Sequence, residues 1–373
     1  MEEELLRELE ELRRRGLYRR RFLPEGLKVL CSNNYLNLSN RREVKEAALR
    51  AVETYGTGSG ASQLVSGYTE LHRSLEEELA KAKGVPACLT VGSGYLANLA
   101  VITALVSEGD LVLSDELNHA SIVDGVRLSK AAKFVYPHRD AKAARLFLEK
   151  RRGGFRRCLI VTDGVFSMDG DLAPLPELVE LAERFDCFLV VDDAHATGTV
   201  GLSSLAYWGL EWKPFVVEVG TLSKALGSYG AFVCGSETLV EYLVNKARPV
   251  IFSTSLPPPS VAAAEAALRV LLAEPSLVER LQNLSREVKK RLRAEGFDLG
   301  PAEEFTPIVP LLVGEEERAL GLRDRLLERG FFVQAIRYPT VPRGKARLRL
   351  TVTLEHPPEV YAAFVQTLVE IWK

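Results

Sequence analysis

Lys224 has the surroundings of a lysine that could form an imine with a carbonyl cofactor. It stands in the segment 219–227, Val-Gly-Thr-Leu-Ser-Lys-Ala-Leu-Gly, among small and hydroxylated residues rather than on a charged helix face. The run before it, Phe215–Val219, is β-branched and aromatic and predicts a buried strand. Open α/β sheets bind ligands at the carboxyl ends of such strands. A lone loop lysine is more often only solvated, so the neighbouring motifs must decide between the two interpretations.

A carboxylate and an imidazole follow a second apolar run. Cys187–Val191 predicts another buried strand and leads directly into Asp192-Asp193-Ala194-His195. An ionised acid at the end of a buried strand is unfavourable unless a cation or several hydrogen-bond donors stabilise it. Asp192 and His195 are therefore candidate functional residues. They have no third partner at a recognised metal-ligand spacing, so the sequence predicts no metal site.

A glycine turn between a strand and a helix could bind an anion. The predicted strand Ala87–Val91 is followed by Gly92-Ser93-Gly94 and then by an apolar helical run that starts at Tyr95. The free backbone amides and the dipole at such a helix start attract a phosphate. The same turn also allows another interpretation, because Gly92-x-Gly94-x-x-Ala97 fits a dinucleotide fingerprint with Asp115 as the ribose-binding acid. From this motif alone, an NAD-dependent dehydrogenase remains an alternative.

His119 and Ser167 follow two further predicted strands, at 111–113 and 157–162. Small residues beside His119 would let its imidazole stack on a planar cofactor, although an isolated histidine more often caps a helix or packs in a core. A helix start for a phosphate, a lysine for an imine and a carboxylate for a ring nitrogen together suit a phosphorylated pyridine aldehyde. A nicotinamide site gives Lys224 and Asp192 no role. The pyridoxal phosphate (PLP) interpretation is therefore favoured.

The composition is that of an ordinary globular protein. The 373 residues carry a formal charge of −2, and 47% of them are hydrophobic and 26% charged. This balance gives no electrostatic reason to expect nucleic acid or a membrane as a partner. The five cysteines contain no Cys-x-x-Cys pair and lie mostly in apolar strand-like runs, which predicts buried free thiols and a reducing, cytoplasmic location. The first residues predict neither a signal peptide nor a membrane anchor.

Strands and helices alternate along most of the chain, which predicts an α/β fold of about two domains. We expect an N-terminal helix-and-strand segment at 1–42, a large domain at 43–257 and a smaller C-terminal α/β domain at 258–373, with the triple proline 257–259 at the last boundary. The first helix is predicted over 2–21, closed by three arginines. Near the other end, the segment 346–351 alternates arginine with leucine, which places Arg347 and Arg349 on one strand face.

Four longer motifs together resemble a known family. They are Gly58–Gly67 (GSGASQLVSG), Phe166–Gly170 (FSMDG), Val191–His195 (VDDAH) and Arg337–Pro342 (RYPTVP). With these motifs the chain, from about Leu17 to His356, resembles the α-oxoamine synthase family of fold type I PLP enzymes. The resemblance implies a large, mostly parallel seven-stranded sheet flanked by helices, with PLP as the cofactor. It also implies a homodimer with its active sites at the subunit interface.

The resemblance assigns roles to individual residues. Lys224 would hold the cofactor as an imine, Asp192 would pair with the ring nitrogen, and His119 would stack on the ring. Ser167 and His195 would hydrogen-bond the region of the ring hydroxyl. Phosphate contacts are implied for Gly94, Tyr95 and Thr221 and, from the partner subunit, for Ser253 and Thr254; substrate contacts are implied for Arg349 and Asn33 at the amino-acid carboxylate, Thr340 near the acyl group and Arg19 at a distant carboxylate.

Family members join an amino acid to an acyl thioester. The runs Leu17–Arg21 (LYRRR) and Leu64–Tyr68 (LVSGY) resemble members that condense L-alanine with a pimeloyl thioester in biotin biosynthesis, losing carbon dioxide. The thioester would be carried on coenzyme A or on acyl carrier protein. Glycine C-acetyltransferase and 5-aminolevulinate synthase activities remain alternatives, because they would use the same ring-binding residues. The presence of Lys224 disfavours a catalytically silent subunit.

Overall fold

The computed structural model describes residues 1–372, which form two compact units. The larger unit holds Asn34–Ser167 and Asp171–Leu281, and the smaller one holds Met1–Asn33, Met168–Gly170 and the chain from Gln282 onward. This division differs from the boundary expected at 257/258. The helix after the triple proline, α11 (Pro258–Ala273), packs against α2 (Arg42–Tyr55) and α3 (Glu70–Lys83), so it belongs to the larger unit.

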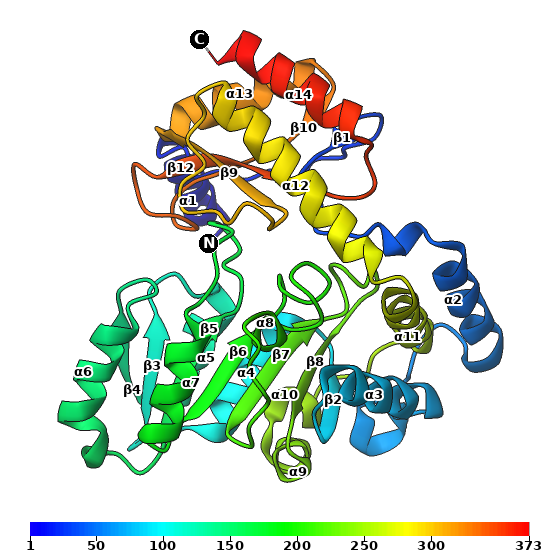
Figure 1. The fold of residues 1–373 in the computed structure, drawn as a ribbon, viewed down its shortest axis with the longest axis vertical. Helices are drawn as coiled ribbons and strands as arrows, with labels where there is room; N and C mark the ends of the chain where they lie inside the picture. Colours follow the sequence, from blue (N-terminus) through cyan, green and yellow to red (C-terminus); the bar gives the residue numbers. More distant parts are fainter. Residues whose placement is uncertain (373) are drawn as a thin grey trace. The chain divides into compact units, whose positions relative to one another are not determined.

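A mostly parallel seven-stranded sheet forms the centre of the larger unit, as predicted (Figure 1). Its order is β2-β8-β7-β6-β5-β3-β4, and only β8 runs antiparallel to its neighbours. The carboxyl ends of the other strands therefore meet at one edge, where such sheets bind ligands. The strands are β2 (Ala87–Val91), β3 (Leu111–Asp115), β4 (Ala132–Tyr136), β5 (Cys158–Asp163), β6 (Phe188–Asp192), β7 (Val216–Thr221) and β8 (Ala231–Gly235).

Helices cover both faces of this sheet and bury two apolar layers (Figure 1). Successive strand residues such as Val190 and Val191 point into opposite layers. A sheet buried on both faces requires apolar residues at every strand position, which explains the continuous apolar runs in the sequence. One layer lies under α4 (Gly94–Leu105), α5 (Ala120–Ser129), α9 (Glu237–Lys246) and α10 (Arg248–Ile251), and the other under α6 (Ala141–Arg151), α7 (Leu175–Arg184) and α8 (Ser204–Tyr207).

The smaller unit contains two small sheets and the terminal helices. In the first sheet β12 (Ala346–Thr351) pairs antiparallel with both β11 (Gln334–Ile336) and β9 (Ile308–Gly314). In the second, β1 (Lys28–Val29) pairs in parallel with β10 (Phe331–Phe332). Its helices are α1 (Glu2–Arg14), α13 (Glu316–Glu328) and α14 (Pro358–Ile371), together with α12 (Ser276–Ala294), which runs across the division at Leu281.

The first helix is shorter than the predicted 2–21. It ends at Arg14, and Gly16 then adopts a left-handed backbone with φ 66°. A glycine in this conformation terminates helices because its missing Cβ removes the steric penalty. Arg337 stabilises the segment that follows, since its Nε and Nη2 donate to the carbonyl oxygens of Gly16 and Tyr18 at 2.7 and 2.8 Å. Arg19 and its neighbours are therefore not helical.

The prediction that all five cysteines are free was wrong for two of them. Cys88 on β2 and Cys234 on β8 lie directly opposite each other in the antiparallel pair, with their Cα atoms 4.2 Å apart, and form a disulfide. They are 146 residues apart in the sequence, so the pairing follows only from the strand order. Cys31, Cys158 and Cys187 are free.

Among residues 1–372, no helix has both the length and the apolar character needed to cross a membrane.

Candidate active site

A cavity of about 110 Å³ opens at the carboxyl edge of the large sheet. Its walls come from the segments that follow β2, β3, β5, β6 and β7, so residues far apart in the sequence meet there. Eight of the predicted site residues line it, together with four others that the sequence analysis did not assign. The lining residues are Gly94, Tyr95, His119, Ser121, Asp163, Ser167, Asp192, Ala194, His195, Thr221, Ser223 and Lys224.

The amino end of α4 and the end of β7 form one wall of the cavity. Helix α4 begins at Gly94, so the backbone amides of its first turn have no partner within the helix; the side chain of Ser93 accepts a hydrogen bond from one of them, that of Leu96, at 3.2 Å. The hydroxyl of Thr221 is buried and has no hydrogen-bond partner among residues 1–372. A Cβ at position 94 would lie 2.8 Å from Cγ2 of Thr221. This close, donor-rich wall fits a phosphate group.

Asp192 is held rigidly at the end of β6. Its carboxylate is buried, and Oδ2 accepts a hydrogen bond of 2.6 Å from Nδ2 of Asn98, while Oδ1 accepts one of 2.9 Å from the amide of Ala194. These two donors satisfy both oxygens of the buried carboxylate, as an acid that follows a buried strand requires. A fixed carboxylate of this kind suits a protonated ring nitrogen.

Asn98 also connects Asp192 to the histidine predicted to stack on the ring. Its Nδ2 donates to the hydroxyl of Ser121 at 2.9 Å, and that hydroxyl lies 2.8 Å from Nδ1 of His119. Desolvation by the surrounding protein lowers the pKa of His119; the carboxylate of Asp192 opposes this and the charge of Lys224 adds to it. A neutral imidazole at neutral pH follows.

His195 receives a partner from far away in the sequence. Its Nδ1 lies 2.6 Å from the hydroxyl of Tyr35, whose ring is completely buried. The hydrogen bond fixes the orientation of the imidazole, which lines the cavity beside Asp192. Nothing in the sequence linked Tyr35 to a residue 160 positions later.

Asp163 is a second buried carboxyl group in the cavity wall and was not predicted. It is the last residue of β5, and its Oδ2 is buried without a hydrogen-bond partner in the part of the chain that the structure describes. Burial raises its pKa well above the usual range, and the neighbouring carboxylates of Asp192 and Asp115 raise it further. Two buried carboxyl groups, Asp163 and Asp192, therefore lie close together in this wall, and their mutual repulsion favours a proton on Asp163. The available clue was an acid at the end of an apolar run, the pattern that drew attention to Asp192.

Ser253 and Thr254 do not line the cavity of Lys224. Within one chain they border a separate small pocket with Gln63, Thr90 and Gly92. The sequence analysis expected them to act on the site of a partner subunit.

The predicted substrate residues lie in the smaller unit. Arg349 is buried on β12, and its Nη1 lies 3.2 Å from Oδ1 of Asn33 and 3.0 Å from the hydroxyl of Thr351. Arg19 and Thr340 are both exposed. The structure thus brings Arg349 and Asn33 together as expected. Arg347, on the same strand face, forms an ion pair of 2.7 Å with Asp169.

The dinucleotide interpretation required a free carboxylate at Asp115. Instead, Oδ1 of Asp115 accepts from the amide of Leu117 and lies 2.9 Å from Nδ1 of His138, and Oδ2 accepts from the amide of Arg139 at 2.8 Å. Both oxygens are therefore occupied within the fold and are not presented to a ribose.

Comparisons with known proteins agree with this geometry. Residues 25–368 match the family model of aminotransferase class I and II. A curated relative from Geobacter sulfurreducens, named 8-amino-7-oxononanoate synthase, is 49% identical over 98% of this chain and 97% of its own length.

Two solved structures resemble the whole fold. Serine palmitoyltransferase from S. paucimobilis, solved with a bound PLP–myriocin aldimine, superposes with a TM-score of 0.88 at 30% identity and covers 98% of this chain and 96% of the other. The 8-amino-7-oxononanoate synthase of Francisella tularensis superposes with a TM-score of 0.79 at 29% identity over 93% of this chain and 98% of its own.

Proposed function

This chain belongs to the class I and II aminotransferase family and, within it, to the α-oxoamine synthases, and on this premise we propose its reaction. The enzyme condenses L-alanine with a pimeloyl thioester to give 8-amino-7-oxononanoate, carbon dioxide and a free thiol, a step of biotin biosynthesis. The name of the Geobacter sulfurreducens relative, almost full length at 49% identity, supports this choice of substrates over those of other family members.

The observation that carries the proposal is the meeting of three groups in one cavity. A lysine amine, a buried carboxylate held by two donors, and a helix start beside an unpartnered threonine hydroxyl all line it. PLP needs these three: an amine for its aldehyde, an acid for its ring nitrogen and donors for its phosphate. When bound, PLP would supply an electron sink for the carbanion that forms at Cα of the amino acid.

The side chains of the cavity then have distinct tasks. Lys224 would hold the cofactor through its aldehyde, and its amine would remove and return the proton at Cα of alanine. Asp192 would hold a proton on the ring nitrogen, and Asn98 orients Asp192 by donating to Oδ2. His119, neutral at neutral pH, would stack on the ring, while Ser167 and His195 would orient the ring from the side of its hydroxyl.

Substrate contacts are assigned to the residues that the family resemblance implied. Arg349, with Asn33, binds the carboxylate of alanine, because a guanidinium matches a carboxylate in shape and charge. Thr340 lies near the acyl group, and Arg19 binds the far carboxylate of the pimeloyl chain. Ser253 and Thr254 complete the phosphate site of a partner subunit in a homodimer. The thioester is carried on coenzyme A or on acyl carrier protein.

The test is thiol release by the purified protein loaded with PLP. L-alanine and glycine are each combined with pimeloyl, acetyl and succinyl coenzyme A, and the alanine and pimeloyl pair is repeated with the acyl group on acyl carrier protein. We expect release with L-alanine and a pimeloyl thioester and at most weak release elsewhere. Release mainly with glycine and a short acyl group would refute the proposed substrates and leave the family reaction standing.

Lys224→Ala is the control for this assay. It removes the amine that moves the proton at Cα, so we expect thiol release to fall to the uncatalysed rate. Thiol release that persists in this variant would show that the measured activity does not come from the cavity described above.

A further inference from the structure

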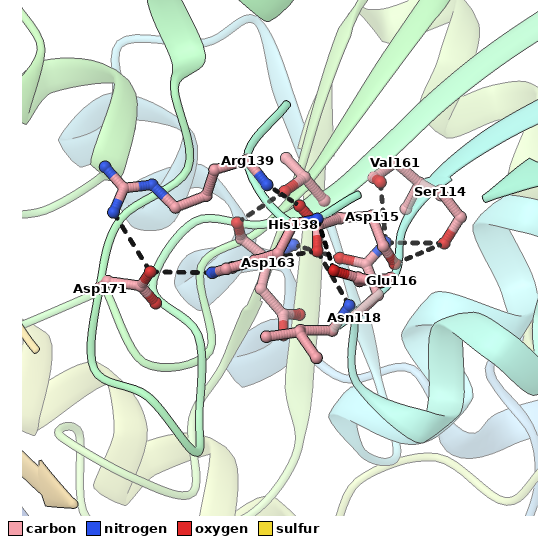
Figure 2. Close-up of polar contacts among 11 residues, drawn as sticks. Ser114, Asp115, Glu116, Asn118, His138, Arg139, Val161, Asp163 and Asp171 are labelled. Carbon is pink, nitrogen blue, oxygen red and sulfur yellow. Dashed lines mark hydrogen bonds and ion pairs between the residues drawn. The ribbon is translucent and has the colours of Figure 1, made fainter. Parts of the chain in front are cut away.

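Three loops at the carboxyl edge of the large sheet meet at His138, which does not line the cavity of Lys224. His138 follows β4, and its two ring nitrogens lie against two carboxylates (Figure 2). Nδ1 is 2.9 Å from Oδ1 of Asp115, at the end of β3, and Nε2 is 2.8 Å from Oδ2 of Asp171, in the loop after β5. Both carboxylates are almost completely buried.

The hydrogen-bonding capacity of imidazole determines its charge here. A neutral ring has a single N–H, so one of its nitrogens would direct a lone pair at a carboxylate oxygen less than 3 Å away. The imidazolium donates to both carboxylates. Burial alone would lower the pKa of His138, but its bonds to Asp115 and Asp171 outweigh burial and raise the pKa to about 9.

Two other charged side chains adjoin this pair. Nη1 of Arg139 lies 3.2 Å from Oδ2 of Asp171, and Oε1 of Glu116 accepts from the backbone amide of His138 at 2.8 Å. Arg139 has a left-handed backbone with φ 61°, a strained conformation for a residue with a side chain. The backbone amide of Arg139 donates to Oδ2 of Asp115, so the same cluster that holds His138 also stabilises this strained backbone conformation.

The Asp171 side of the cluster controls the loop that carries Ser167. The backbone oxygen of Asp171 accepts from the amide of Phe166 at 3.0 Å, and Val165 and Leu172 form an isolated bridge, so the loop is closed at its base. The ring of Phe166 stands edge-on to His138 with centroids 4.4 Å apart. Fixing Asp171 therefore fixes the base of the loop whose Ser167 faces the cavity.

The Asp115 side controls the loop that carries His119. Oδ1 of Asp115 accepts from the amide of Leu117, two residues before His119. Between them, Asn118 donates to the carbonyl of Val161 at 2.8 Å and accepts from the amide of Asp163 at 3.0 Å (Figure 2). The loop after β3 is therefore tied to β5 next to the cavity wall.

We propose that His138 is a positioning residue for the cofactor: as an imidazolium bridging Asp115 and Asp171, it holds the loops of His119 and Ser167 against the cavity. It contacts neither the cofactor nor the substrate itself. The proposal rests on the proposed function, because it takes PLP as the ligand that these loops contact.

The first test compares His138→Gln with the wild type. Glutamine is neutral and cannot replace the imidazolium that bridges the two carboxylates. We therefore expect the apoenzyme to bind PLP roughly 10-fold more weakly, as when a residue that orients a ligand-binding side chain is lost. Hydrogen exchange of the apoenzyme at pH 7 should be faster in the peptide 164–172 and unchanged in 308–314. His356→Gln, which removes a half-buried histidine of the smaller unit bonded to the carbonyl of Val29, is the matched control and should change neither measurement.

The second test uses pH, because a merely structural role would not move a titration. In the wild type, PLP affinity should weaken above about pH 9, where His138 loses its proton. Asp171→Asn keeps the shape of the side chain but removes one carboxylate, so the fall in PLP affinity should begin at lower pH. In His138→Gln this fall should be absent. The proposal fails if PLP affinity falls at the same pH in all three proteins, or if the peptide 164–172 exchanges equally in wild type and His138→Gln.

The outcomes separate this proposal from the proposed function. A wild-type protein that binds no PLP would refute the proposed function. The hydrogen-exchange comparison needs no cofactor, so it would still test whether His138 holds the loop. A His138→Gln protein that does not fold leaves the decision to Asp171→Asn and its pH profile.

Discussion

A single amide, Asn98, supports two functional side chains of the candidate active site. Its Nδ2 donates to Asp192 and to Ser121, which in turn bonds His119. Replacing Asn98 with leucine, of similar size, would leave the buried carboxylate with one donor fewer. A hydrogen bond to a charged group contributes about 1.5–3 kcal/mol. We therefore expect kcat for thiol release to fall by roughly 10- to 100-fold, with the fold retained.

Asn245→Leu is the matched control, because Asn245 is an exposed helix residue that bonds only to the carbonyl of Glu241 among the contacts of its side chain described here. It should leave kcat unchanged. A near-normal kcat in Asn98→Leu would mean that Asp192 does not depend on this amide.

At the scale of residues, the sequence was informative where side-chain chemistry followed a strand directly. Lys224, Asp192, His195 and Ser167 were found in this way, and all line the cavity. Asn98, Tyr35 and Asp163 were missed. Asn98 lies inside an apolar helix, and Tyr35 meets His195 only through the fold. Asp163 could have been found by the argument used for Asp192.

The disulfide of the large sheet joins its edge strand β2 to β8. Loss of a cross-link that closes about 150 residues should remove up to about 5 kcal/mol of stability in the chain-entropy view. For the double variant Cys88→Ala with Cys234→Ala we expect the Tm to fall by roughly 5–10 °C. Reductant should lower the Tm of the wild type by a similar amount, as measured by calorimetric scans with and without it.

Cys31→Ala provides the comparison, because Cys31 is free and half-buried. Its Tm should respond to reductant just as the wild type does. If reductant leaves the wild-type Tm unchanged, the thiols of Cys88 and Cys234 are not joined in solution. The pairing also weakens the argument from cysteines to a reducing compartment, since buried disulfides do persist inside some heat-adapted cells.

At the scale of elements, the apolar strands were predicted to within two residues, because a sheet buried on both faces leaves a continuous apolar run. Ala87–Val91, for example, was predicted with its observed bounds. The predicted first helix was too long because the amphipathic pattern of the sequence continues past the observed end of the helix. In the structure, Gly16 and the hydrogen bonds from Arg337 end the helix. The division between the units was misplaced because α11 packs on α2 and α3, which no local pattern reveals.

The whole molecule is proposed to be a dimer whose partner completes each phosphate site. In one chain Ser253 and Thr254 lie in a pocket apart from Lys224. We therefore expect Thr254→Val to weaken PLP binding and activity. When the Thr254→Val protein is denatured, mixed with the inactive Lys224→Ala protein and refolded, activity should return, because each mixed dimer contains one site with both native residues. Random pairing gives about a quarter of the wild-type number of native sites.

The same refolding of each variant alone is the control and should restore nothing. A mixture no more active than the two variants measured separately would show that Thr254 does not act across the subunit interface.

The parallel pairing of β1 with β10 has a consequence for synthesis on the ribosome. Residues 28–29 pair with residues 331–332, and Gly16 and Tyr18 are held by Arg337. The amino-terminal segment thus leaves the ribosome first, but its pairing partners are synthesised only roughly 300 residues later, after about 15–60 s of translation. The larger unit ends at Leu281 and is synthesised earlier. The nascent chain therefore presents residues 16–29 without these partners throughout this interval, which makes them a segment that chaperones and proteases can encounter.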